Sequence, residues 1–335
     1  MFKFYKLIFF CSMMAGTLIT ISAYSWMSMW MGLEINLLSI IPLMKNNSNQ
    51  FSTEASFKYF ITQSMASTLF LMVMILNINL IEQINSFTNN IVQTIFYSSI
   101  LIKLGGAPFH AWFPEVLEGL SWMNCLLMLT WQKIAPMIIL IQNFKMSMFM
   151  ILIIIMSAFI GGTLGLNQIS IRKIMAYSSI NHIAWMLSTM MSSKIIWLIY
   201  FIIYSIISII IILTFKLTKT MFLHQMTFFK NKLVNLICNL NFLSLGGLPP
   251  FLGFFPKWLT INFLIYNQNI LISTILIFTT LISLFVYTRI IFSTLIISSS
   301  EMIFKKNETS KFSIIFSNFI VLTMLVMCPL TLNSF

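Results

Sequence analysis

Long apolar runs separated by short polar links dominate the chain. Each run is about 20 residues long, the length that crosses a lipid bilayer as a helix. The runs predict about eleven membrane helices, at 3–24, 26–44, 55–78, 88–118, 119–142, 147–166, 168–191, 194–216, 231–267, 269–297 and 312–333. Glycine and proline interrupt the fourth and ninth runs, so we expect both to be broken helices. The pattern is that of an all-α polytopic membrane protein.

Composition and charge agree with this class. Hydrophobic residues make up 59% of the 335 residues and charged residues only 8%, which excludes an ordinary soluble domain. On the predicted map, 13 of the 19 basic residues fall on the side of the N-terminus and two, Lys145 and Lys194, on the other. Positive loops stay on the cytoplasmic or matrix side, so the N-terminus is expected there. An odd number of helices places the C-terminus on the opposite side.

Four ionisable residues fall inside the apolar runs: Glu34, Lys103, Lys133 and Lys257. A charge at the centre of a membrane helix costs roughly 2.5–3.5 kcal/mol even on insertion scales, so such residues are rare and usually functional. Together they indicate a route for protons or cations. Structural alternatives remain open: a static pair for Glu34 and Lys103, a buried structural cation for Lys133, and a snorkelling side chain for Lys257.

The two Gly/Pro interruptions resemble each other, which indicates an internal repeat. Residues 104–114 and 245–256 share the order Leu-Gly-Gly-x-Pro, and Phe109 and Pro114 match Phe251 and Pro256 after a one-residue shift. Because the interrupted helices lie five apart, the two units enter the membrane from opposite sides and the repeat should be inverted. We expect repeats at 1–144 and 145–297, followed by a loop and last helix at 298–335. Two unrelated interruptions of similar composition are the alternative.

Histidine chemistry is possible at two positions. His182 lies in a run with Ser178, Ser179 and Asn181 and could carry a proton between Lys133 and Lys257, because histidine titrates near neutral pH. A hydrogen-bonded core histidine is the other reading. His110 follows the first interruption and could be structural or functional. The scattered cysteines and histidines do not support haem, iron–sulfur or zinc sites, and the net charge of +12 reflects topology rather than nucleic-acid binding.

Several stretches resemble the antiporter-like membrane subunits of respiratory complex I, the proton-translocating NADH dehydrogenase. They occur in the family's order, and some are specific to one of its subunits. The matching stretches are 32–36, 58–63, 103–115, 130–136, 172–182 and 246–257. The resemblance implies two inverted five-helix repeats plus a further helix. Glu34 and Lys103 would be the charged pair of the first half, Lys133 the central relay, and Lys257 the lysine of the second half that opens toward the far side.

The resemblance also implies a role without redox chemistry in this chain. The chain would translocate protons within the mitochondrial inner membrane, with its N-terminus in the matrix and its C-terminus in the intermembrane space. NADH, FMN, iron–sulfur clusters and ubiquinone would be bound by other subunits, and the partners would be other membrane-arm subunits, including antiporter-like ones, and membrane lipids. A stand-alone cation/proton antiporter of the same fold is the alternative function.

Overall fold

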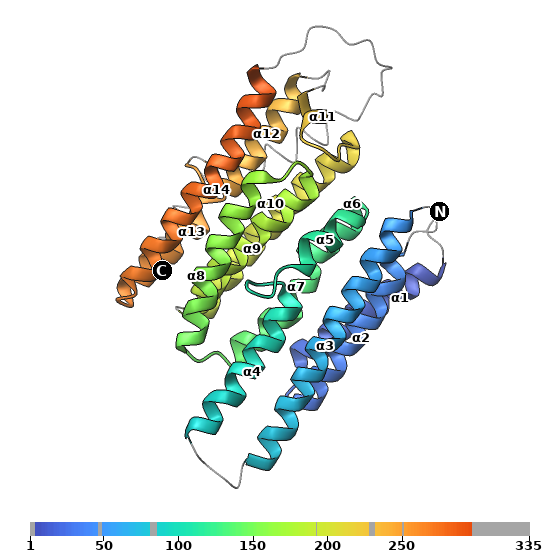
Figure 1. Cartoon of the computed structure of the whole chain (residues 1–335), viewed down its shortest axis with the longest axis vertical. Coiled ribbons are helices and arrows are strands. Elements are labelled where there is room, and N and C mark those ends of the chain that lie inside the picture. Colours follow the sequence, from blue (N-terminus) through green and yellow to red (C-terminus); the bar gives the residue numbers. More distant parts are fainter. Residues whose placement is uncertain are drawn as a thin grey trace. The chain divides into compact units, whose positions relative to one another are not determined.

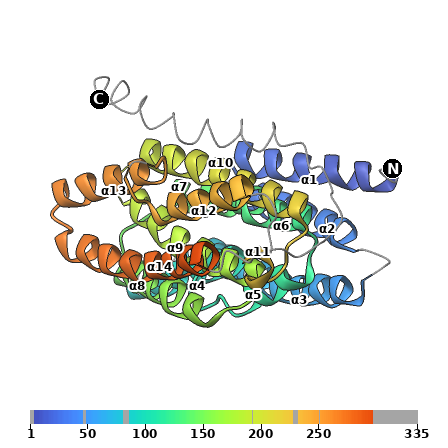
Figure 2. The ribbon, with the colours of Figure 1, turned by 90° about the horizontal axis from the view of Figure 1, so that it is seen from above.

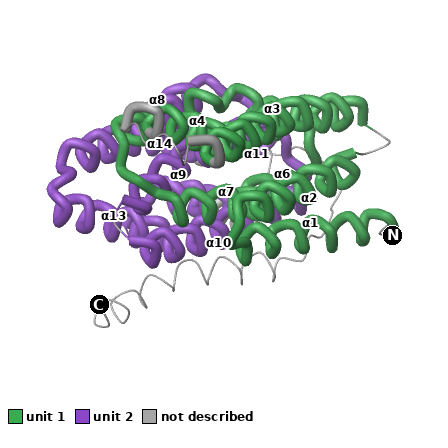
Figure 3. The backbone as a smooth tube through the Cα atoms, turned by 90° about the horizontal axis from the view of Figure 1, so that it is seen from below, with its two compact units in different colours: residues 1–153 green, residues 154–335 purple. Residues whose placement is uncertain are grey.

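The structure is a computed structural model, and it describes residues 4–45, 49–80, 86–191, 193–227, 232–249 and 251–296. Within these residues the chain is helical, apart from one isolated β-bridge between Ser170 and Phe222. The chain divides into two compact units, residues 1–153 and 154–335 (Figure 3). Each unit is described by itself, and the expected repeat boundaries stay a prediction.

Among the described residues, the first unit contains seven whole helices, α1 to α7. Helix α3 packs against α2, α4 and α5, and α4 packs against α7 (Figure 1). The helices are α1 (Phe4–Ser22), α2 (Trp26–Met44), α3 (Gln50–Leu80), α4 (Ser86–Leu104), α5 (Trp112–Gly119), α6 (Trp122–Leu129) and α7 (Trp131–Gln142).

The closest helix pair in this unit is α1 with α2, and two glycines permit it. A Cβ at Gly16 would lie 3.0 Å from the carbonyl oxygen of Gly32, and a Cβ at Gly32 would lie 2.8 Å from that of Gly16. Small residues let membrane helices approach to van der Waals contact, where packing rather than the hydrophobic effect holds them together. This contact fixes the part of α2 that carries Glu34.

The second unit centres on α9, whose neighbours are α10, α13 and α14. Helix α12 packs against α10 and α14 (Figure 2). Helix α8 (Met148–Thr163) leads into this unit, followed by the 3-10 helix η1 (Leu164–Asn167). The others are α9 (Ile171–Met190), α10 (Lys194–Thr218), α11 (His224–Thr227), α12 (Lys232–Gly246), α13 (Phe254–Tyr266) and α14 (Ile270–Ile296).

Both predicted helix interruptions are confirmed, and they share one backbone design. Helix α4 ends before Gly105 and α12 before Gly247, with φ of 73° and 74°. In each, the amide after the glycine donates to the carbonyl five residues earlier, at 3.1 Å in the first break and 3.4 Å in the second. This is the Schellman ending, which needs a left-handed residue and so favours glycine. The next helices begin at Trp112 and Phe254.

The shared geometry of the two breaks changes which residues of the two repeats correspond to each other. Helix end, left-handed glycine and next helix start are each 142 residues apart, as the pairs 104 and 246, 105 and 247, and 112 and 254 show. Gly105 therefore corresponds to Gly247, and not to Gly246 as the Leu-Gly-Gly order predicts. Phe109 with Phe251 and Pro114 with Pro256 keep the same spacing, so no one-residue shift is needed.

Other expected helices differ from the structure. The run 119–142 is divided at Thr130, the residue between α6 and α7, and α3 begins five residues earlier than predicted. Among the described residues, seven helices are long and apolar enough to cross a membrane, so the count of eleven is not reached. Helix α9 falls short because its polar residues lower its hydropathy, and the broken helices are too short. The predicted helix 312–333 lies outside the described residues.

Candidate functional site

Lys103 lies at the end of α4 and faces a small polar cavity in the first unit. The side chain is 9% exposed, and the cavity measures about 10 Å³, close to the space that a single water needs. The cavity is lined by Leu33, Asn36, Leu37, Tyr59, Gln63, Lys103, Gln132 and Pro136. Residues from α2, α3, α4 and α7 therefore meet around the first buried lysine.

Three of the lining side chains form a buried hydrogen-bonded chain. The Tyr59 hydroxyl donates to Gln132 Oε1 at 3.4 Å, and Gln132 Nε2 donates to Asn36 Oδ1 at 2.8 Å. Gln63 Nε2 donates to the backbone carbonyl of Lys103 at 3.4 Å. The chain links α3, α7 and α2 and ends at Asn36; its central member, Gln132, directly precedes Lys133 in the sequence. Sequence reasoning did not assign these residues.

Glu34 and Lys103 do not form a contact ion pair in the described part of the chain. Glu34 Oε1 is buried and has no hydrogen-bond partner there, although its charge and that of Lys103 still act on each other through space. Burying a carboxylate oxygen without a hydrogen-bond partner costs free energy, so such atoms are rare in folded proteins. The structure therefore does not show Glu34 and Lys103 as a static contact pair that locks α2 to α4.

Lys133 lies in the first turn of α7 and is only 2% exposed. Its ammonium is 5.7 Å from the centroid of the Phe113 ring, within the range of a cation–π contact. Phe113 in turn packs close to Gly105, where an added Cβ would lie 3.1 Å from the Phe113 Cβ. The aromatic residue after the first break thus lies between the break and the central lysine.

Side chains satisfy the backbone carbonyls that the first break exposes. The Trp112 indole N–H donates to the carbonyl of Ile102 at 3.1 Å, and Gln63 serves the next carbonyl. The half-buried His110 stays within the turn, with Nδ1 3.2 Å from the carbonyl oxygen of Pro108. The role of His110 in proton transfer stays a prediction.

At the second break a lysine performs this role. The Lys257 ammonium donates to the carbonyls of Gly246 at 3.0 Å and Leu245 at 3.3 Å, the last carbonyls of α12. A cation at this position also meets the negative end of the helix dipole. The side chain is 6% exposed and crosses directly over Gly247, where a Cβ would lie 2.8 Å from Lys257 Cδ. Lys257 is therefore turned inward, unlike a snorkelling side chain.

His182 lies on the polar face of α9 within the second unit. Its Nδ1 is 2.8 Å from the Tyr200 hydroxyl, and its ring centroid is 5.0 Å from that of Tyr204. Trp185 is three residues further and so lies on the same helix face, with its ring centroid 5.9 Å from the Lys257 ammonium. Lys257 thus contacts the side chain that lies one turn of α9 beyond His182.

Asn181 carries a buried polar atom of this helix that lacks a hydrogen-bond partner among the described residues. Its Nδ2 donates to Ser283 at 3.3 Å, but Oδ1 is buried without a partner among the described residues. In the same part of the chain, no three His, Cys, Asp or Glu side chains form a group that could hold a metal ion. The site offers buried ammonium, imidazole, phenol and amide groups, which can hold and pass protons.

The fold and the site define a polytopic helical membrane protein that carries buried protonatable residues beside broken helices. The family model for "NADH:quinone oxidoreductase/Mrp antiporter, TM" matches residues 23–283. A chain named NADH-ubiquinone oxidoreductase chain 2 from Anopheles gambiae is 46% identical over 96% of both chains. The chain of the same name from Mus musculus is 38% identical over 91% of this chain and 88% of its own.

A solved structure shares the fold. A chain of respiratory complex I from Thermus thermophilus superposes with a TM-score of 0.85 at 20% identity, covering 99% of this chain and 80% of that one. The protein described here belongs to the NADH:quinone oxidoreductase/Mrp antiporter family of membrane proteins. The resemblance expected from the sequence is confirmed.

Proposed function

We propose that this chain is a membrane-arm subunit of proton-translocating NADH:ubiquinone oxidoreductase, respiratory complex I. The observation that carries the proposal is the 46% identity with a chain 2 of that enzyme over 96% of both sequences. The alignment covers 96% of each chain, which supports a common architecture. The buried lysines support the same assignment, because ionisable groups inside membrane helices are costly and therefore rare, and they usually mark transport paths.

The proton path consists of Glu34, Lys103, Lys133, His182 and Lys257, with His110 as a further candidate. In the first unit, the cavity beside Lys103 and the hydrogen-bonded chain through Gln132, the residue before Lys133, support transfer toward Lys133. In the second unit, the contact of Lys257 with Trp185, one turn of α9 from His182, supports transfer between Lys257 and His182. Proton gain or loss at one group changes the electrostatic energy of the next, which moves the charge onward.

Chemistry at NADH, FMN, the iron–sulfur clusters and ubiquinone belongs to other subunits in this proposal. The chain lies in the mitochondrial inner membrane with its N-terminus in the matrix and its C-terminus in the intermembrane space. The excess of basic residues on one side of the predicted map supports that orientation. Its partners are other membrane-arm subunits, including antiporter-like ones, and membrane lipids.

The proposed architecture has eleven membrane helices in two inverted five-helix repeats. The common Schellman ending and constant spacing of the two breaks support the repeat. Inversion would place the broken helices on opposite sides of a shared path, as in other transporters built from repeats. A superposition that matched α4–α5 with α12–α13 only without inversion would exclude this arrangement.

The decisive experiment removes the central charge. In Lys133→Met the side chain keeps its length and apolar stem, so packing against Phe113 is retained while proton transfer is lost. Proton uptake by sealed membrane vesicles per NADH oxidised should fall severalfold. The control Lys145→Met removes an exposed lysine of the α7–α8 loop and should leave that ratio unchanged. An unaltered ratio in Lys133→Met would exclude the relay.

Native electrophoresis separates this proposal from the stand-alone antiporter. Solubilised membranes should place the chain in the band that oxidises NADH. Migration mainly as a free chain, with cation-dependent proton exchange in vesicles that hold this chain alone, would support the antiporter instead.

A further inference from the structure

Arg289, a cation on a membrane helix, has no acidic partner among the described residues of its unit. Arg289 is the sole charged residue of α14, and most of this helix is a candidate membrane span, Ile270–Phe292. From residue 119 to residue 300 the sequence contains neither Asp nor Glu. The described part of the second unit therefore has no acidic residue at all, and its positive charges require counter-ions from elsewhere.

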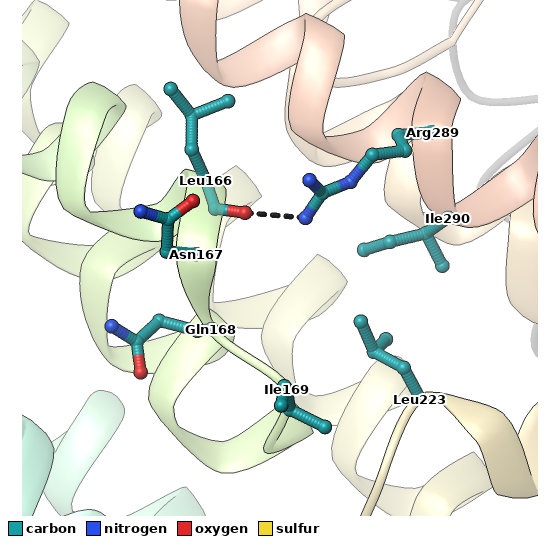
Figure 4. Close-up of a pocket in the computed structure, with 7 residues that line it drawn as sticks. All are labelled: Leu166, Asn167, Gln168, Ile169, Leu223, Arg289 and Ile290. Atoms are coloured by element: carbon teal, nitrogen blue, oxygen red, sulfur yellow. Dashed lines mark hydrogen bonds between the residues drawn. The ribbon is translucent and has the colours of Figure 1, made fainter.

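The Arg289 guanidinium is held in place by a backbone carbonyl. Its Nη2 donates to the carbonyl oxygen of Leu166 in η1, the 3-10 turn that ends the α8 span (Figure 4). A guanidinium has five N–H donors in a rigid plane, and no further hydrogen bond of this group occurs among the described residues. The contact orients the group and leaves most of its donors available.

Those donors face an open pocket of about 530 Å³, within the range of about 300–1,000 Å³ typical of small-molecule sites. Its polar members are Arg289 and the side-chain amides of Asn167 and Gln168 (Figure 4). The others are the apolar side chains of Leu166, Ile169, Leu223 and Ile290. The pocket thus joins a cationic, amide-rich part to an apolar wall.

The position of the pocket matches the membrane–water boundary. It lies where the α8 span ends at Asn167 and close to the end of the α14 span. Ile169, which lines it, is 66% exposed, and the nearby Leu164 is 43% exposed. Apolar side chains beside a cation at this depth face both acyl chains and phosphate groups. The neighbouring α9 begins with Arg172 and Lys173, which adds to the positive potential.

We propose that this pocket binds the phosphodiester of an anionic membrane phospholipid, with Arg289 as its principal ligand. The planar guanidinium pairs with phosphate oxygens through two parallel N–H···O bonds, a geometry that lysine cannot provide. Asn167 and Gln168 line the same pocket, but the Gln168 amide donates to the carbonyl of Leu164 at 3.3 Å and extends away from Arg289 (Figure 4), so the guanidinium alone is assigned to the phosphate. Ile169 and Leu223 contact the start of the acyl chains.

The test measures lipid binding to the assembled complex that contains this chain. After extraction in mild detergent and washing, native mass spectrometry would follow rebinding of phosphatidylglycerol, phosphatidylcholine and inorganic phosphate, each added alone. The variant Arg289→Gln should bind phosphatidylglycerol about 10- to 100-fold more weakly at one site, since it loses charge-assisted hydrogen bonds. Lys216→Gln, which removes an exposed cation of the same unit outside the pocket, should bind as the natural protein does.

Three results would overturn the proposal. The first is equal phosphatidylglycerol binding in Arg289→Gln and the natural protein. The second is binding of inorganic phosphate with the lipid excluded, which would indicate a soluble anion site. The third is lipid binding that appears only in the double variant Glu301→Gln/Glu308→Gln, which would show that the chain's own acids neutralise Arg289.

Arg289→Lys is a second variant, which tests the proposal even if Arg289→Gln fails to assemble into the complex. It keeps the charge but not the fork, so we expect phosphatidylglycerol binding between that of the natural protein and that of Arg289→Gln. A cryo-EM map of the natural complex gives a readout without any variant. Phosphate-shaped density beside Arg289 would support the site, and polypeptide density filling the pocket would overturn it.

Discussion

The strongest prediction concerns Gly247, because one added methyl group there acts on both the helix ending and Lys257. The residue has φ of 74°, and a Cβ would lie 2.8 Å from Lys257 Cδ and 3.1 Å from its Nζ. In Gly247→Ala the lysine must therefore move from the carbonyls of Leu245 and Gly246. The substitution tests whether the position of this ammonium matters for proton transfer.

The magnitude follows from two terms. Left-handed backbone costs a non-glycine residue about 1–2 kcal/mol. Each hydrogen bond from the Lys257 ammonium to a carbonyl contributes about 1.5–3 kcal/mol when the donor is charged. We expect Gly247→Ala to destabilise the second unit by about 3 kcal/mol or more, and to lower proton translocation per NADH oxidised severalfold.

Two control variants separate the cost of the left-handed backbone from the loss of the Lys257 hydrogen bonds. Gly105→Ala carries the same conformational cost, at φ of 73°, but no lysine crosses Gly105. Gly246→Ala changes the adjacent glycine, where a Cβ would lie 3.3 Å from Tyr287 and no left-handed strain arises. Thermal unfolding of the purified complex and vesicle proton uptake are the measurements. Equal effects of Gly247→Ala and Gly105→Ala on stability and uptake would refute a special role of the lysine position.

Three further substitutions test other contacts. Tyr59→Phe removes the donor to Gln132 and should lower proton uptake while the complex still assembles; unchanged uptake would exclude this hydroxyl from the path. Trp112→Phe leaves the carbonyl of the first break without its indole donor and should cost about 1–3 kcal/mol in thermal unfolding, more than Trp131→Phe, whose indole N–H has no partner among the described residues. Lys58→Met breaks two exposed ion pairs and should lower thermal stability much less than Trp112→Phe does, with the difference shrinking in high salt.

The sequence predicts the helices of this protein where apolar runs are long and uninterrupted. The bounds of α2 and α10 fall within about two residues of the expected ones, because composition and bilayer thickness together determine such helices. The interruption at Thr130 was not predicted, since neither glycine nor proline marks it. The hydroxyl and the backbone amide of Thr130 both donate to the carbonyl of Leu126, at 2.7 and 3.0 Å, and such bonding from a threonine side chain bends helices in a way that composition does not reveal.

The sequence predicted the charged residues of the candidate site but not the neutral polar residues that surround them. Lysines in apolar runs are conspicuous because of their cost, and all three prove to be buried. Asn36, Tyr59 and Gln132 have no such signal, because neutral polar residues are tolerated in many membrane helices. Their roles depend on distances between α2, α3 and α7, which a single sequence does not contain. They do lie within the stretches that carry the family resemblance, at 32–36, 58–63 and 130–136.

The common spacing of the two breaks shows which residues occupy corresponding positions in the two units, and the charged residues at these positions differ. Lys257 corresponds to Glu115, 142 residues earlier, and Glu115 points outward to an exposed ion pair with Lys58 at 2.9 Å. Lys103 precedes its break, whereas Lys257 follows its own. The buried lysines are therefore not equivalent residues of a repeat. Neutral donors cap the first break, but an ammonium caps the second. If Lys257 releases a proton, as the proposed path requires, the hydrogen bonds that end α12 weaken and the cation at its dipole is lost. Among the described residues, the first break has neutral donors in that place and no such coupling.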